Sequence, residues 1–347
     1  MIPRDIKLDL AKGLLIILVV IGHSIQYSFG GGWLLSEEYY GSVAYKAIYS
    51  FHMPLFMMIS GFLFYESNKK RPFRELVLSK IKSLGIPLLS FGFICNFPAF
   101  VNLINGGGIF IGIIKFIRLV LFGWSMWFLM SLLINTITIA IITKVFHNRK
   151  VQAFFMMSLS IGFLFFSDTL FLSVYKFMFP FFCIGYLVKQ EEINIYKYSN
   201  NAGIVLGFTI LSIASIIWFD TDTYVYTTGI YLNGNAQHQL FIDIKRFVIA
   251  LVVSFTFMQY IKFFSECNLS SIKGKIQRIG QASLFIYGFN IIFDTYYSHL
   301  ALYVPFTFKP NVFIPVLFTI IVLSCAYYLY VFLTRNKLTR LCFTGKS

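Results

Sequence analysis

Charged residues are scarce in this 347-residue sequence, where only 12% of positions are Asp, Glu, Lys or Arg. Soluble globular domains carry roughly 25%, so the composition argues against a soluble domain. The sequence also lacks a Walker loop, an HExxH or GxSxG motif, and a GxGxxG motif placed between a strand and a helix. These absences leave no sign of a nucleotide-binding P-loop, a zinc protease, a serine hydrolase or a dinucleotide-binding fold.

Cysteine is rare and shows no pairing pattern. The five cysteines contain no CxxC and no metal-ligand spacing. We therefore predict neither a disulfide framework nor a bound metal.

Long apolar runs make up most of the chain, which is 58% hydrophobic with a mean hydropathy of +0.75. A bilayer is crossed by about 20 apolar residues in a helix. The sequence predicts an all-α polytopic membrane protein in which 1–347 form a single transmembrane domain. The first run is too long for a signal peptide and lacks a small-residue cleavage site. The ten expected spans are 8–28, 43–65, 83–104, 125–146, 151–167, 170–188, 202–219, 240–264, 280–302 and 311–333.

The net charge of +15 has two readings, nucleic-acid binding or orientation in a membrane. The basic residues cluster in short connections between apolar runs, and no basic patch with a reading helix or sheet is visible. The positive-inside bias then places both termini in the cytoplasm, and no nucleic-acid partner is expected. The apolar segment 109–122 is short and contains Lys115 and Arg118, which indicates an interfacial or re-entrant piece. The polar outer connection 220–239 is long enough to be functional.

Ionisable residues follow one stripe of the first helix. Lys12 and His23 are eleven residues, about three turns and 16 Å, apart, and Asp5 and Asp9 lie within about 40° of the same face. Charges inside a membrane are costly, so this face is expected to meet the protein interior or a cavity. The alternative is that Asp5, Asp9 and Lys12 are interfacial charges that reach toward water.

Other polar residues interrupt later apolar runs. His52 lies at a depth comparable to His23, in a helix that Pro54 can kink; it either serves function or satisfies the kinked backbone. Ser60 and Gly61 would allow close helix approach. The basic segment 69–82 can set topology, attract anionic headgroups or hold the phosphates of a nucleotide-bearing cofactor. Further buried polar candidates in and before the ninth span are Arg278, Ser283, Tyr287, Asn290 and Asp294, whereas Trp124 and Trp127 are expected to be interface anchors.

In this order the residues resemble the acyltransferase-3 family of membrane acyltransferases. The family has a basic residue and a histidine separated by ten residues on its first helix, a spacing that Lys12 and His23 fit. Residues 51–56 (FHMPLF) and 60–62 (SGF) are similar to its second-helix pattern, and Lys80 and Lys82 before Pro87 to its third-helix entry. Later echoes are 127–129 (WFL), 279–280 (IG), 283–284 (SL) and 286–287 (IY). The sequence departs from the family in having Asn290 where many members have histidine, and lysine where arginine is common before Pro87.

The resemblance implies an enzyme that moves an acyl group, usually acetyl, from cytoplasmic acetyl-CoA to a hydroxyl of a glycan or lipid-linked sugar. We expect His23 to be the general base, since neutral imidazole suits that task. Asp9 is too distant from His23 to orient it and is expected to pair with Lys12 or Arg4. The remaining roles are His52 for orienting the acceptor or stabilising charge, Lys12, Lys80, Lys82 and Arg4 for the donor phosphates, and Asp9, Asn290 and Tyr287 for substrate contacts.

The resemblance further implies a multi-pass protein of the bacterial inner-membrane type, with membrane lipid and a saccharide acceptor as its partners. Two other classes remain open. Ten helices with a polar stripe could form a transporter of a lipid-linked sugar or small solute, for which inverted repeats or paired broken helices would argue. A non-catalytic subunit of a polysaccharide assembly complex would tolerate changes at Lys12 and His23.

Overall fold

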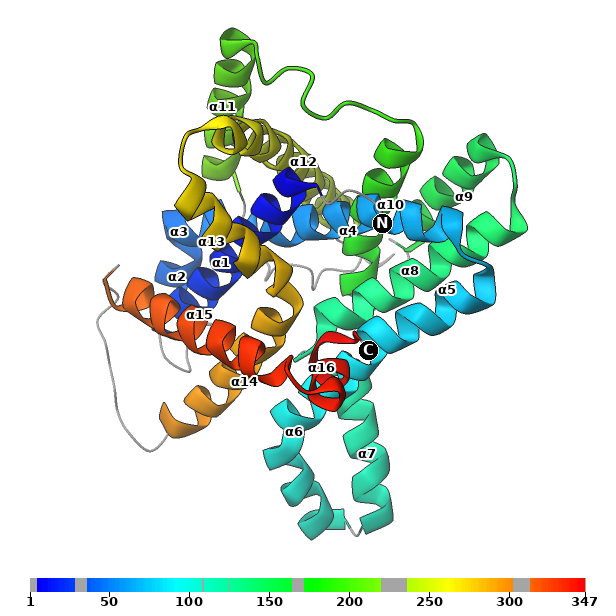
Figure 1. Cartoon of the computed structure of the whole chain (residues 1–347), viewed down its shortest axis with the longest axis vertical. Helices are drawn as coiled ribbons and strands as arrows, with labels where there is room; N and C mark the ends of the chain where they lie inside the picture. Colours follow the sequence, from blue (N-terminus) through cyan, green and yellow to red (C-terminus); the bar gives the residue numbers. More distant parts are fainter. Residues whose placement is uncertain are drawn as a thin grey trace.

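The computed structural model of the chain describes residues 5–28, 36–107, 109–123, 125–163, 172–219, 236–301 and 313–346, and these are almost wholly helical without a strand (Figure 1). Arg4, Trp124 and most of the connection 220–239 lie outside the described residues. The helices are α1 (Ile6–Ser28), α2 (Glu37–Gly41), α3 (Val43–Tyr49), α4 (His52–Lys70), α5 (Phe73–Lys80), the π-helix η2 (Ile81–Gly85), α6 (Ile86–Gly107), α7 (Ile109–Phe122), α8 (Trp127–Val145), α9 (Arg149–Gly162), α10 (Leu172–Gln190), α11 (Ala202–Ile217), α12 (Ala236–Glu266), α13 (Ser270–Gln281), α14 (Ser283–Ala301), α15 (Phe313–Leu333) and α16 (Lys337–Thr344).

Five stretches of the described residues are long and apolar enough to cross a bilayer. They are Ile6–Gln26, Val43–Lys70, Phe73–Leu103, Trp127–Val145 and Pro315–Leu333. Phe177–Gln190 and Ala202–Ile217 are apolar but shorter. An all-helical protein with several apolar helices is therefore confirmed, while the count of ten spans and the cytoplasmic termini stay predictions.

The second expected span is interrupted. Its residues form two helices, α3 and α4, and the helix is interrupted at Ser50 and Phe51. Pro54 does not kink a continuous helix, because it lies in the first turn of α4, where its missing N–H would have no helical partner. The break directs the start of α4 toward α1.

Several helices without a strong apolar signal join the expected spans. α5, α13 and α16 are short and charged on one side, and the π-helix η2 carries Lys82 between α5 and α6. The segment expected to be interfacial or re-entrant is the helix α7, which packs along α6 as one arm of a hairpin (Figure 1). A second interruption of helical structure separates α7 from α8.

Helix α1 runs through the middle of the bundle and contacts α4, α12, α13, α14 and α15. Glycines allow the closest crossings. A Cβ on Gly280 would lie 2.1 Å from the Asp9 carbonyl oxygen, so α13 crosses α1 backbone to backbone. Cβ atoms on Gly61 and Gly185 would lie 2.0 and 1.9 Å from carbonyl oxygens of Phe182 and Met58, which confirms the close approach expected at Gly61.

Candidate active site

A histidine, an aspartate and an asparagine meet where α1 crosses α14. The Nδ1 atom of His23 lies 2.7 Å from Oδ2 of Asp294. Asn290 is one turn before Asp294 on α14, and its amide nitrogen lies 2.8 Å from both Oδ2 of Asp294 and Nδ1 of His23. The His23 side chain keeps 22% of its surface exposed, against 8% for Asp294. The imidazole is thus held from its buried side and open on the other.

The direction of these hydrogen bonds depends on which ring nitrogen of His23 carries the proton. With Asp294 ionised and Nδ1 protonated, the Nδ1–H of His23 donates to Asp294 and the Asn290 amide donates to the same oxygen. The Nε2 atom then carries the lone pair. This is the arrangement in which an aspartate fixes the tautomer of a general-base histidine and stabilises the imidazolium that forms.

The second candidate histidine, His52, is the first residue of α4. His52 is almost fully buried, and its Nδ1 is 2.6 Å from the carbonyl oxygen of Ile48, so Nδ1–H donates to the end of α3. The Tyr49 ring packs edge-on to His52 at 5.1 Å, and the Tyr49 hydroxyl donates to Oε1 of Gln26 at 2.9 Å. His52 therefore satisfies a backbone carbonyl at the α3–α4 break, which was one of the two roles expected of it. Its Nε2 atom is the one left for any chemical role.

At the other end of α1, Asp9 pairs with Lys12. Their Oδ1 and Nζ atoms are 2.8 Å apart, and the Gln281 amide lies 3.4 Å from Oδ2 of Asp9. The pairing of Asp9 with Lys12 rather than His23 is as expected. Eleven residues of helix keep this ion pair about 16 Å from His23, so the polar stripe of α1 resolves into two separate clusters.

A basic pocket of about 430 Å³ opens between α4, α5, α8, α9 and α10. Its lining combines cations with amides and aromatic rings, and none of the described lining residues is acidic. Gln190 is buried there, and its Oε1 atom has no hydrogen-bond partner among the described residues. The cationic and imidazole residues of the basic pocket are Lys69, Arg71, Lys144, His147 and Arg149.

The remaining sequence candidates lie elsewhere. Lys80 ends α5 with its Nζ 5.1 Å from the centre of the Phe64 ring, and Lys82 lies in η2; neither lines the basic pocket. The Tyr287 hydroxyl lies 3.5 Å from the carbonyl oxygen of Ser125 at the α7–α8 break, one turn below Asn290. Within the described residues no cluster of three His, Cys, Asp or Glu side chains could hold a metal ion.

Sequence reasoning noted Asp294 as a buried polar residue but did not connect it to His23. The signal was present, since Asn290 and Asp294 are four residues apart in an apolar helix and therefore share a face. The contributions of α8 and α9 to the basic pocket carried no such signal, because Lys144, His147 and Arg149 read as an ordinary positively charged inner loop.

Comparison with known proteins matches residues 5–331 to a family model described as an acyltransferase domain, Acyl_transf_3. The nodulation protein NolL of Sinorhizobium fredii is 30% identical over 234 residues, which cover 64% of this chain and 60% of that protein. The nodulation protein NolL of Mesorhizobium japonicum is 29% identical over 244 residues, covering 66% of this chain and 60% of that protein. The chain thus matches about three fifths of the length of these relatives. No solved structure matches the chain.

Proposed function

Since the chain belongs to the acyltransferase-3 family, we propose that it is a membrane O-acyltransferase that moves an acetyl group from acetyl-CoA to a hydroxyl of a glycan or lipid-linked sugar. The observation that carries the proposal is the 2.7 Å contact between His23 and Asp294, which leaves Nε2 of a partly exposed imidazole as a base. A hydroxyl is a weak nucleophile until its proton is removed, and this pair supplies that function.

The chemical step begins with the acceptor hydroxyl beside Nε2 of His23. Its oxygen attacks the carbonyl carbon of the acetyl thioester as its proton passes to Nε2. The carbon–sulfur bond of the tetrahedral intermediate then breaks, and the coenzyme A sulfur leaves with the proton from the imidazolium. Asp294 stabilises that imidazolium and holds the ring in place, and Asn290 holds the carboxylate of Asp294.

His52 and Tyr287 are the further residues that we assign to this reaction. His52 would orient the acceptor or stabilise the negative charge that develops on the carbonyl oxygen. Tyr287 and Asn290 come from the same face of α14 and would contact the substrate near the transferred group. The proposed step requires no metal.

The basic pocket suits the phosphates of the donor, because its lining is cationic and its volume of about 430 Å³ is within the range of small-molecule sites. Tyr65 of the pocket and His52 are thirteen residues apart on α4, about 20 Å along the axis. The donor would extend its pantetheine arm over that distance, past Lys80, Lys82 and the Asp9–Lys12 pair. Arg4, which precedes α1, would add a charge at the same end.

The proposal places this single transmembrane domain in a cell membrane of the bacterial inner-membrane type. Ten spans with both termini in the cytoplasm would put the basic pocket on the donor side. His23 lies in the other half of its helix, which favours transfer to an acceptor that approaches from the outer side.

One feature favours a transporter as the second candidate. Helical structure is interrupted at Ser50–Phe51 and again between α7 and α8. Discontinuous helices form substrate sites in many transporters. Uptake or efflux of a lipid-linked sugar by vesicles without acetyl-CoA would support this candidate.

The deciding experiment measures transfer of radiolabelled acetyl from acetyl-CoA to surface polysaccharide in membranes. Wild type is compared at matched expression with His23→Ala and with His238→Ala, an exposed histidine near the start of α12. We expect His23→Ala to lose the label and His238→Ala to keep it. Equal labelling by His23→Ala would overturn the base assignment. If wild type transfers neither acetyl nor longer acyl groups, the transporter becomes the better account.

A further inference from the structure

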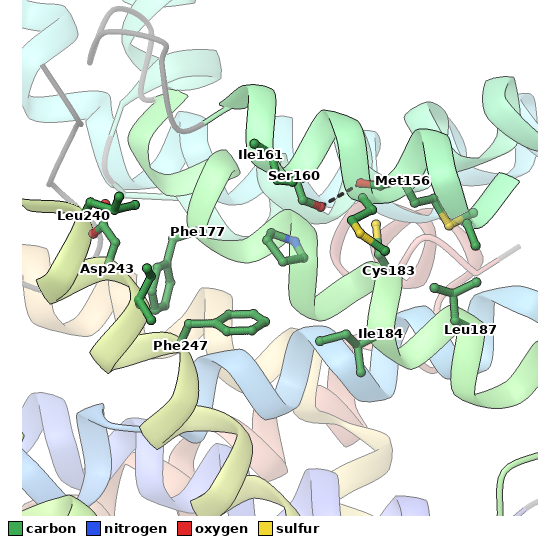
Figure 2. Close-up of a pocket in the computed structure, with 14 residues that line it drawn as sticks. Met156, Ser160, Ile161, Phe177, Cys183, Ile184, Leu187, Leu240, Asp243 and Phe247 are labelled. Atoms are coloured by element: carbon green, nitrogen blue, oxygen red, sulfur yellow. Dashed lines mark hydrogen bonds between the residues drawn. The ribbon is translucent and has the colours of Figure 1, made fainter. Parts of the chain in front are cut away.

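Two cavities lie along one face of α12. Leu240, Asp243, Ile244 and Phe247 line a cavity of about 370 Å³, in which they face residues of α9 and α10 (Figure 2). A second cavity of about 610 Å³ is lined by the next residues of the same face, Leu251, Ser254, Phe255 and Met258. The spacing of three and four residues is that of a single helical stripe, and 240 to 258 spans about 27 Å. This is close to the thickness of a bilayer core, about 30 Å.

Both cavities touch Ile184 of α10, and the larger cavity is also lined by Leu55, Met58, Ile59 and Phe62 of α4. Phe247 of the smaller cavity packs against Phe181 of α10, with their ring centres 4.9 Å apart. The walls are almost entirely apolar. Ser160 is one exception, and its hydroxyl already donates to the Met156 carbonyl at 2.8 Å (Figure 2). Such walls match a hydrocarbon chain and not a sugar or a nucleotide.

The end of the larger cavity is polar and basic. Asn194, Lys197 and Tyr198 line it, from the connection between α10 and α11. Lys197 is exposed and forms no ion pair with any described residue, and Lys7 lies 4.6 Å from the neighbouring Tyr196 ring. The positive-inside bias places this end at the cytoplasmic leaflet, whose anionic headgroups attract lysine. The far end carries Asp243, so a phosphate is favoured at the Lys197 end alone.

One polar group inside the larger cavity lacks a partner. Ser254 is fully buried, and its hydroxyl has no hydrogen bond with any described residue. Buried hydroxyls are normally bonded, and an unmet one points to a missing partner. Gln259 donates to the Ile195 carbonyl at 2.7 Å and so marks the depth of the polar end. Ser254 is five residues away, about 7–8 Å deeper along α12, and so lies below the polar end of the cavity, on the side of the acyl chains.

We propose that the space between α10 and α12 binds an anionic phospholipid of the cytoplasmic leaflet. The phosphate lies against Lys197 and Asn194, an ester carbonyl accepts the hydrogen bond of Ser254, and one acyl chain follows the face of α12 toward the smaller cavity. The site is separate from the residues of the proposed acyl transfer and does not rest on that function.

Native mass spectrometry of the full chain, purified in detergent and stripped of lipid, tests this site. Phosphatidylglycerol with long acyl chains is added, and the bound fraction is compared with that of phosphatidylcholine and of phosphatidylglycerol with four-carbon chains. We expect one long-chain phosphatidylglycerol per chain, bound more tightly than either comparison lipid. Equal binding of the short-chain lipid would overturn the proposal, because each buried methylene should strengthen binding about fourfold.

Variants locate the site. Ser254→Phe fills the cavity and should weaken binding at least about tenfold by displacing several methylenes, whereas Leu206→Phe on the exposed face of α11 should not. Lys197→Glu should remove the preference for phosphatidylglycerol, and Lys337→Glu, another exposed lysine, should leave it. Unchanged binding by both Ser254→Phe and Lys197→Glu would refute the site. Displacement of the lipid by acetyl-CoA would assign the cavity to the donor instead.

Discussion

The contact between His23 and Asp294 joins residues that are 271 positions apart in the sequence. In the proposed reaction this contact orients His23 as the base, because an ionised carboxylate favours a proton on the ring nitrogen that faces it. A histidine bonded only to a backbone carbonyl, as His52 is through Nδ1, gains orientation but no neighbouring negative charge. This difference is why we assign the base to His23.

Asp294→Asn should lower kcat of acetyl transfer by about 10²–10⁴, the range that base and tautomer control supply. KM for acetyl-CoA should change little, since Asp294 is remote from the donor phosphates. Steady-state kinetics on matched amounts of folded enzyme measure both constants. A variant with wild-type kcat would show that the carboxylate does not support the base.

Arg149→Gln should raise KM for acetyl-CoA about tenfold without lowering kcat, as expected when a hydrogen bond between a charged group and a phosphate is lost. Lys275→Gln, on an exposed part of α13, is the matched control. Titration of acetyl-CoA at saturating acceptor separates the two constants. A fall in kcat at unchanged KM would show that the basic pocket does not bind the donor.

At the scale of helices, glycines decide how closely the pairs that frame the site can pack. Gly61 and Gly185 let α4 and α10 touch backbone to backbone, and Gly13 and Gly280 do the same for α1 and α13. The second crossing leaves the Asp9–Lys12 pair beside Gln281. The breaks before His52 and after α7 then turn short polar segments toward α1 and α14.

Gly185→Leu should destabilise the protein, because its Cβ would lie 1.9 Å from the Met58 carbonyl oxygen. Overpacking of this kind costs about 1–3 kcal/mol or more. Gly207→Ala on α11 meets nothing within 4 Å and should be neutral or slightly stabilising, by up to about 1 kcal/mol. Thermal unfolding in detergent compares the two variants. Equal melting temperatures would mean that the α4–α10 crossing relaxes freely.

At the scale of the whole molecule, the residues of the proposed reaction occupy two levels. The triad of His23, Asn290 and Asp294 lies at one level, and the basic pocket lies at the α4–α5 end of the bundle. The proposal therefore requires the donor to span the protein between them, which depends on the orientation of the chain in the membrane.

Cys267 tests that orientation, because it is exposed in the connection between α12 and α13. With cytoplasmic termini, a membrane-impermeant maleimide should label Cys267 in inverted vesicles and not in intact cells. The test is made with Cys325→Ala and Cys342→Ala already in place, because these two cysteines are also accessible, and adding Cys267→Ala should then remove the label. Labelling in intact cells would reverse the topology and move the basic pocket to the outer side.

The long apolar runs were enough to predict most helices. A segment in lipid must form its backbone hydrogen bonds within its own helix, and such a helix needs about 20 apolar residues to cross the bilayer. The expected 8–28, 202–219 and 311–333 compare with α1, α11 and α15 to within two residues at each end. The sequence could not place α5, α13 or α16, whose charged faces carry no such signal. It also missed the break at Ser50–Phe51, which neighbouring helices stabilise.

The sequence by itself determined that this is a helical membrane protein, and it singled out His23, Asp9 and Lys12, because ionisable residues stand out against apolar runs. The Asp9–Lys12 pair followed from local helical spacing. Only the tertiary structure decided that Asp294 and Asn290 contact His23, that α8 and α9 complete the basic pocket, and that α10 and α12, with α9 and α4, line the two apolar cavities. These features depend on contacts between helices that are distant in sequence, and helical periodicity describes a single helix without naming its neighbours.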